Sequence, residues 1–172
     1  ATAAREVLVS AGTINSPQLL ELSGIGQAER LQGLGIEVVH ELKGVGENLR
    51  DHYAPRMKWS VPKSLALTYN VKGRGPRVVW EALKYLFTDK GLLGITAAPL
   101  RAYIRTRAGL EAPNAVIGWV PFLVGDNFTL AKESGVTAFM HILRSESQGS
   151  IHVLSADAKQ SPEIRFNFLS AQ

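Results

Sequence analysis

Residues 12–26 constrain the fold of this chain more than any other segment, because they join an apolar run to a short helix through two glycine turns. The run at residues 5–11 is typical of a buried, parallel strand, and it stops at Gly12, where the backbone can turn or approach a ligand closely. Ser16 and Pro17 are typical of an N-cap followed by the first helical position. Residues 23–26 supply the glycine-rich stop of a helix of about two turns.

Residues 27–42 predict two more short elements. Residues 27–33 predict a second short helix, closed by Gly33 and Gly35. Residues 36–42 then alternate in character and predict a strand.

A different pattern begins after Tyr53. Residues 76–89 predict a longer helix, with Pro76 at its start and Gly91 beyond its end. Its apolar stripe at the i, i+3, i+4 spacing predicts the buried side, which leaves Glu81 and Lys84 on the solvent side.

Strands dominate the rest of the chain. Alternation at Met57, Trp59 and Val61 predicts the first strand of an antiparallel sheet. Five further runs predict strands at residues 100–106, 114–124, 135–143, 149–154 and 163–168. We therefore expect an α+β fold, with an antiparallel sheet backed by helices.

Residues 44–52 form a second compact motif, Gly44-Val-Gly-Glu-Asn-Leu-Arg-Asp-His52. Residues 12–26 and 44–52 resemble, in the same order, the second signature and the Asn-Leu-x-Asp-His segment of the glucose-methanol-choline (GMC) oxidoreductases. Residues 147–157 and 162–170 resemble two further stretches of that family, with Phe168 where tyrosine is common. The chain is thus similar to choline dehydrogenase-like GMC enzymes over nearly its whole length.

The resemblance implies that residues 1–52 are the end of an FAD-binding α/β domain, a remnant of it at the N-terminus of this chain. It also implies that residues 53–172 form an incomplete substrate-binding domain whose sheet faces the flavin. It implies an FAD-dependent oxidoreductase that oxidises a CH–OH group of choline or another primary alcohol by hydride transfer to the flavin. A complete GMC enzyme opens with a Gly-x-Gly-x-x-Gly fingerprint and has a histidine base near its C-terminus, and this sequence matches neither. We therefore expect an internal fragment of a longer parent, inactive and without tightly held FAD when alone.

Seven residues are candidates for contact with FAD through the resemblance: Ser10, Ala11, Gly12, Ser16, Asn48, Asp51 and His52. Simpler explanations stay open, with Gly12 as a turn glycine and Ser16 as a helix cap. Asn48 and Asp51 also suit partners for backbone groups in a tight crossing between domains. We expect no catalytic residue within the chain, and the spacing of its four histidines predicts no metal site.

The middle of the chain resembles the family least, and substrate specificity would reside there. Thr96, Trp119 and Phe122 are candidates for the wall of an alcohol-sized pocket, because aromatic and small polar side chains on sheet faces line such cavities. A packed core is the simpler explanation for the two aromatic residues. Choline would favour an aromatic cage, to which Trp59, Trp80 and Trp119 could contribute.

Composition excludes several other classes. The net charge of +4 is modest, and the basic cluster at residues 72–77 lacks interleaved aromatic residues, which favours a solvated loop over a nucleic-acid surface. The absence of cysteine removes disulfides and thiolate metal sites. The longest apolar run, residues 115–125, falls well short of the ~20 residues of a membrane span. We expect a cytoplasmic protein that binds a small-molecule alcohol.

Two other function classes stay open. A non-catalytic sheet domain derived from the GMC framework would bind a ligand or a protein partner, and a homodimer is one way to cover its unpaired strand edges. A small hydrolase that uses a serine and His52 has little support, because no Gly-x-Ser-x-Gly motif occurs.

Overall fold

The computed structural model describes residues 3–65, 68–96, 98–125 and 129–171, and the chain divides into two compact units. Unit 1 comprises Ala1–Asp51 and Ser145–Gln172, and unit 2 comprises His52–Arg144. Residues 145–172 thus share a compact unit with residues 1–51, and the predicted division into an FAD-binding domain (1–52) and a substrate-binding domain (53–172) stays a prediction. Residues 145–172 pack with the N-terminal segment, because Leu49 and Gly149 exchange both backbone hydrogen bonds, at 2.9 and 2.8 Å.

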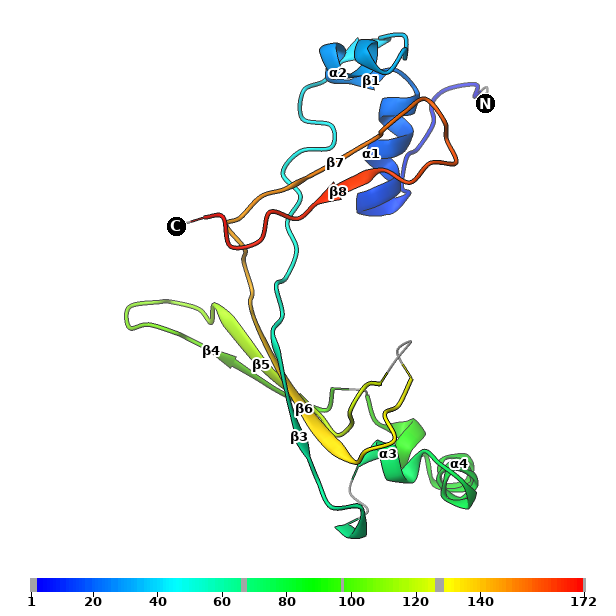
Figure 1. Cartoon of the computed structure of the whole chain (residues 1–172), viewed down its shortest axis with the longest axis vertical. Helices are drawn as coiled ribbons and strands as arrows, with labels where there is room; N and C mark the ends of the chain where they lie inside the picture. Colours follow the sequence, from blue (N-terminus) through cyan, green and yellow to red (C-terminus); the bar gives the residue numbers. More distant parts are fainter. Residues whose placement is uncertain (1–2, 66–67, 97, 126–128, 172) are drawn as a thin grey trace. The chain divides into compact units, whose positions relative to one another are not determined.

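Unit 1 combines helices with two very short pairs of strands (Figure 1). Its elements are α1 (Gly12–Leu22), β1 (Ile25–Gly26), α2 (Ala28–Gly33), β2 (His40–Glu41), β7 (Ser150–His152) and β8 (Glu163–Arg165). The pair β1–β2 is parallel and the pair β7–β8 is antiparallel. Figure 1 shows β7 running alongside α1. Leu31, Ile36 and Val153 form the buried core of this unit.

The predicted strand at residues 5–11 is wrong. These residues are exposed and form no strand, and no other strand of the described residues pairs with them. An apolar run becomes a buried strand only where another strand accepts its backbone hydrogen bonds.

The predicted start of the first helix is also corrected. α1 begins at Gly12, whose φ is +78°, and Pro17 lies inside it. Ser16 is therefore helical and caps nothing, and Ala11 occupies the N-cap position without a side-chain hydrogen bond. Pro17 removes one intrahelical bond and leaves the others in place. The predicted glycine stop is confirmed, because Gly24 follows the helix with a φ of +80°.

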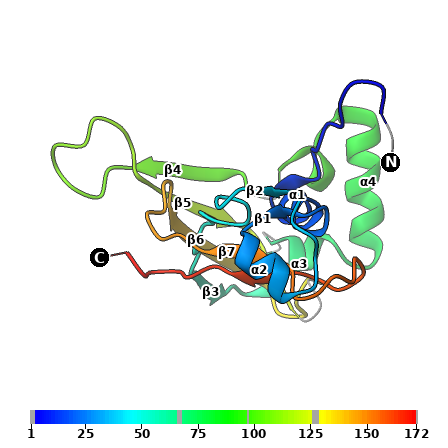
Figure 2. The ribbon, with the colours of Figure 1, turned by 90° about the horizontal axis from the view of Figure 1, so that it is seen from above.

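Unit 2 is built on a four-stranded antiparallel sheet. Its strands are β3 (Arg56–Ser60), β4 (Leu100–Ile104), β5 (Ala115–Val120) and β6 (Gly135–Ile142), in the spatial order β3-β6-β5-β4. Figure 2 shows β4 and β3 at opposite edges of this sheet. The short helices η1 (Lys63–Leu65), α3 (Tyr69–Lys72) and η2 (Leu92–Gly94) and the longer α4 (Pro76–Thr88) complete the unit. The predicted α+β class is confirmed.

The register of the sheet produces one face without a polar side chain. Directly opposed residues of antiparallel strands share a face, and alternate residues follow them. That face, the apolar sheet face, consists of Met57, Trp59, Leu100, Ala102, Ile104, Ala115, Ile117, Trp119, Val136, Ala138, Met140 and Ile142. Six of its large side chains are exposed, from 41% for Met140 to 65% for Leu100, whereas Ile104, Ile117 and Val136 are half-buried. Apolar patches of this kind mark binding surfaces for ligands or for other protein segments.

α4 lies where the sequence predicts it, but the predicted solvent side is wrong. Glu81 is 6% exposed, whereas Leu86 and Phe87 are 73% and 82% exposed. The Glu81 carboxylate accepts hydrogen bonds from Lys84 Nζ at 2.7 Å and from the Leu92 N–H at 3.0 Å. These two bonds lower the pKa of Glu81. The bond from the Leu92 N–H also holds η2 against the polar side of the helix.

None of the helices in the described residues combines the length and the apolar character that a membrane crossing requires.

Candidate functional site

Unit 1 contains an open cleft of about 690 Å³ between α1 and the segment that follows β2. The unit 1 cleft is lined by Thr13, Ser16, Pro17, Leu20, Leu42, Gly44, Val45, Gly46, Glu47, Asn48, Leu49, Arg50 and Ile151. Its two long walls are therefore the two sequence segments, residues 12–26 and 44–52, that carry the strongest motifs. Segments that are separate in the sequence meet at one cavity.

The second wall of the cleft is fixed to β7 by its backbone. Ile151 N–H donates to the Gly46 carbonyl at 2.7 Å, and Leu49 pairs with Gly149. Gly46 has a φ of +79°, and a Cβ at that position would lie 2.2 Å from the Ile151 carbonyl oxygen. Only glycine allows this close approach, so the glycine motif serves the packing of the cleft wall.

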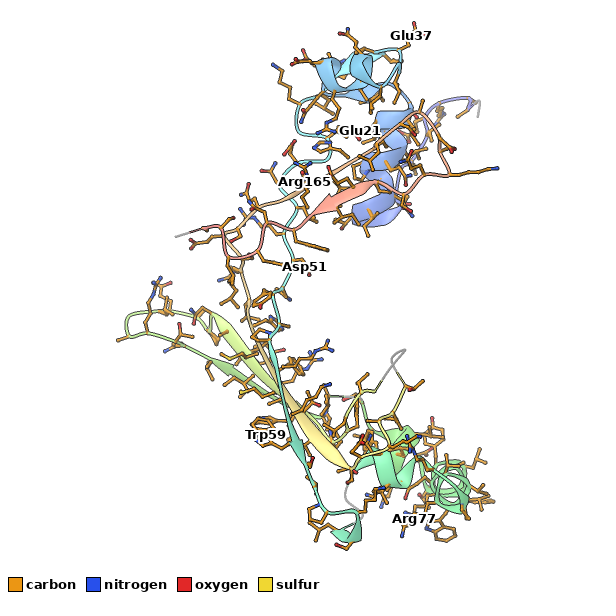
Figure 3. All side chains as sticks on the ribbon, in the orientation of Figure 1. Glu21, Glu37, Asp51, Trp59, Arg77 and Arg165 are labelled. Carbon is orange, nitrogen blue, oxygen red and sulfur yellow. The ribbon has the colours of Figure 1, made fainter. Side chains whose placement is uncertain are left out.

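Glu47 of this wall forms an ion cluster with two buried residues behind the wall, Glu21 and His152. His152 Nδ1 lies 2.7 Å from Glu21 Oε1, and His152 Nε2 lies 3.0 Å from Glu47 Oε1. Glu21 is fully buried and His152 is 4% exposed, while Glu47 reaches the cleft. Figure 3 shows Glu21 on α1 within unit 1. Because the carboxylates approach opposite ring nitrogens, the three groups cannot share one metal ion.

Sequence reasoning missed this cluster. Glu21 stands among leucines on a short helix, and His152 alternates with apolar residues in a strand. A carboxylate within an apolar stretch is the one local signal that could have indicated a buried partner. The identity of that partner, 131 residues away in the sequence, is visible only in the fold.

The structure brings two of the predicted FAD contacts to the cleft. Ser16 and Asn48 line it, and Asn48 holds a left-handed backbone with a φ of 61°. Ser10 and Ala11 are exposed and precede α1, and Gly12 adjoins the cleft-lining Thr13. Their contact with FAD stays a prediction.

The remaining two predicted FAD contacts lie on either side of the division between the units. Asp51 is the last residue of the first segment of unit 1, and His52 is the first residue of unit 2. The His52 ring stacks on His141 with the centroids 4.0 Å apart, and its Nε2 lies 3.4 Å from the Leu143 carbonyl oxygen. Their role at the flavin stays a prediction.

The chemistry of the cleft suits a dinucleotide such as FAD. The first turn of α1 has no side-chain cap, so its N–H groups are available to an anionic or carbonyl oxygen. A Cβ at Gly12 or Gly44 would meet no atom of the chain within 4 Å, which leaves space for a ligand beside the backbone. Arg50 supplies a cation, and Pro17 and Leu20 supply an apolar surface. Residues that would hold FAD are therefore present.

The predicted pocket residues of unit 2 make separate contacts. Trp119 stacks on Trp59 across the apolar sheet face with the ring centroids 5.6 Å apart, and Figure 3 labels Trp59 on β3. Phe122 stacks instead on Tyr69 at 5.8 Å. Thr96 is exposed. A shared substrate pocket for these three residues stays a prediction.

Comparison with known proteins gives consistent relatives. Residues 1–54 match the family model described as GMC oxidoreductase. An oxygen-dependent choline dehydrogenase of Pseudomonas aeruginosa (strain LESB58) is 38% identical over 99% of this chain and 30% of its own length. A protein of the same name from Pseudomonas fluorescens (strain Pf0-1) is 35% identical over 100% of this chain. The chain spans about 30% of the length of these curated relatives.

Solved structures agree with the sequence relatives. A formate oxidase superposes with a TM-score of 0.82 at 25% identity, over 98% of this chain and 34% of its own. An FAD-dependent oxidoreductase from Chaetomium thermophilum superposes with a TM-score of 0.74 at 18% identity, over 98% of this chain and 35% of its own, which supports the fold alone. Residues 1–54 are thus similar to GMC oxidoreductases, and the chain as a whole is similar to the choline dehydrogenases and to the formate oxidase.

Proposed function

We propose that this chain is the central part of an FAD-dependent oxidoreductase that acts on the CH–OH group of a small alcohol. The observation that carries the proposal is the unit 1 cleft, in which the two family motifs form opposite walls. The relatives support it, because they are GMC oxidoreductases that are about three times longer than this chain. The chain alone is expected to be inactive, since the segments that complete a GMC enzyme have no match in it.

In this proposal unit 1 holds one side of the cofactor. Ser16 and Asn48 donate hydrogen bonds to FAD, and Arg50 faces its negative charge. The apolar part of the cleft, including Pro17 and Leu20, excludes water from the ligand. When bound, FAD supplies the hydride acceptor, and the contribution of this chain is to bind and orient it.

Unit 2 supplies the substrate side in this proposal. The apolar sheet face presents two stacked tryptophans, Trp59 and Trp119, each 43% exposed. An aromatic surface attracts a quaternary ammonium through the negative face of its rings, which suits choline. Choline or another primary alcohol is therefore the proposed substrate, in agreement with the names of the curated relatives. Other segments of the longer protein, or a second copy in a homodimer, would cover what the substrate leaves exposed.

The test is flavin retention followed by reduction. The longer protein that contains this segment is purified, incubated with FAD, desalted and examined by visible absorption, with the 172-residue chain treated in parallel. We expect flavin absorption only in the longer protein, and anaerobic bleaching of that absorption on addition of choline or another primary alcohol. A longer protein that retains no flavin, or whose flavin no alcohol reduces, would contradict the proposal and favour a non-catalytic binding domain.

A further inference from the structure

The ion cluster in unit 1 has a defined charge pattern. An ionised carboxylate only accepts hydrogen bonds, and a neutral imidazole donates from only one nitrogen. Both nitrogens of His152 face carboxylate oxygens, at 2.7 and 3.0 Å. With Glu21 and Glu47 both ionised, the contacts require an imidazolium that donates on each side. His152 is then the cation that holds two carboxylates together.

Two further hydrogen bonds join the cluster to the rest of unit 1. The second oxygen of Glu21 accepts from the Val153 N–H at 2.8 Å, and Glu47 Oε1 accepts from Gln27 Nε2 at 2.7 Å. Among the described residues, no lysine or arginine forms an ion pair with Glu21. His152 is therefore the charged partner on which the buried carboxylate depends.

The backbone around the cluster leaves it no room to rearrange. A Cβ on Gly46 would lie 2.7 Å from His152 Nδ1, and a Cβ on Gly26 would lie 3.2 Å from Glu21 Cγ. Two glycines thus enclose the imidazole and the buried carboxylate. A change at Glu21 or His152 therefore has to move the neighbouring backbone or leave a buried polar group without a partner.

Three separate parts of unit 1 meet at these contacts. Glu21 belongs to α1, His152 to β7, and Glu47 to the wall of the cleft beside Asn48. The cluster therefore ties the cleft wall to the strand behind it and to the helix that forms the opposite wall. The side chains of the cluster other than Glu47 line no part of the cleft.

We infer that Glu21, His152 and Glu47 are positioning residues for the cofactor. The His152 imidazolium donates one hydrogen bond to each carboxylate, and these bonds fix residues 44–50 in the conformation that receives FAD. This inference rests on the proposed function. It deepens that function by naming groups that are not among the predicted FAD contacts, Glu21 and His152, as those that set the geometry of the cleft.

The first test follows the cleft wall in the 172-residue chain, without cofactor. Hydrogen exchange of the Ile151 and Leu49 N–H groups reports the contacts of this wall with β7. His152→Gln and the milder Glu47→Gln are expected to speed this exchange by at least about tenfold, because a hydrogen bond to a charged group contributes a factor of that size. His40→Gln, at an exposed histidine of the same unit, is the matched control and is expected to change nothing.

The second test is spectroscopic and separates a charged link from simple packing. The ¹⁵N chemical shifts of His152 are expected to show a proton on both ring nitrogens, as donation to two carboxylates requires. A neutral His152 ring, or exchange that is unchanged in both His152→Gln and Glu47→Gln, would overturn the inference.

The third test uses the longer protein. Glu47→Gln is expected to raise the Kd for FAD by at least about tenfold, since the wall must be ordered before the cofactor binds, while His40→Gln leaves it unchanged. If the unmodified protein binds no FAD, the proposed function fails, whereas the exchange experiment still decides whether the cluster orders the wall. If FAD binds equally well to Glu47→Gln, the positioning role is wrong and the proposed function stands.

Discussion

Gly46→Ala is the substitution for which the structure predicts the largest local effect in the cleft. Gly46 has a φ of +79°, and placing an alanine in this left-handed region costs about 1–2 kcal/mol of stability. The added Cβ would also lie 2.2 Å from the Ile151 carbonyl oxygen and 2.7 Å from His152 Nδ1. Relief of such overlap costs about 1–3 kcal/mol more. We therefore expect a total destabilisation of about 2–5 kcal/mol in unit 1.

Native-state hydrogen exchange of the 172-residue chain measures this loss where it occurs. The Ile151 N–H, which donates to the Gly46 carbonyl at 2.7 Å, is expected to lose protection by this amount. Gly44→Ala is the matched control, because a Cβ at Gly44 meets nothing within 4 Å and its φ lies outside the left-handed region. The control is expected to change stability by less than about 0.5 kcal/mol. Equal protection of Ile151 in the two variants would refute the steric argument.

Three other predictions concern unit 2. Glu81→Gln is expected to destabilise α4 by about 1 kcal/mol at neutral pH. Because the pKa of Glu81 is lowered from 4.5 in the folded state, the stability that its charge contributes is present above pH 4.5 and lost as the pH falls through the lowered pKa. The free energy of unfolding should therefore depend less steeply on pH in the variant when both proteins are titrated with acid. Phe87→Ser, at a side chain that is 82% exposed, is expected to change the unfolding free energy by less than about 0.5 kcal/mol and to reduce self-association in sedimentation experiments; a large loss of stability would show that Phe87 is packed. Gly118→Ala places a Cβ 2.1 Å from the Phe139 ring, and the expected loss of about 1–3 kcal/mol in urea unfolding should be partly recovered in the double variant with Phe139→Ala.

The elements that sequence patterns predicted correctly are those whose signals are local. Pro76 and the apolar spacing define α4, and alternation defines the strands of unit 2. The orientation of α4 was wrong, because the hydrogen bond from the Leu92 N–H to Glu81 depends on a turn that no periodicity encodes. An amphipathic pattern gives the apolar side of a helix, but it does not say whether the covering partner is present.

The candidate site also contains contacts that local sequence patterns could not predict, because they join residues far apart in the sequence. The motifs correctly predicted that residues 12–26 and 44–52 matter, and the fold brings Ser16 and Asn48 to one cleft. The pairing of Glu21 with His152 joins residues far apart in the chain, so neither residue carries a local sign of the other. The strand predicted at residues 5–11 failed for a related reason, because pairing depends on a neighbouring strand that the described residues do not provide.

The most direct test of the account is hydrogen exchange of the longer protein with and without FAD. The account predicts that FAD slows exchange at residues 12–16 and 44–50, the two walls of the unit 1 cleft, and leaves the turn around Gly109 in unit 2 unchanged. Protection that falls elsewhere in the protein and spares both walls would contradict the assignment of this cleft to the cofactor.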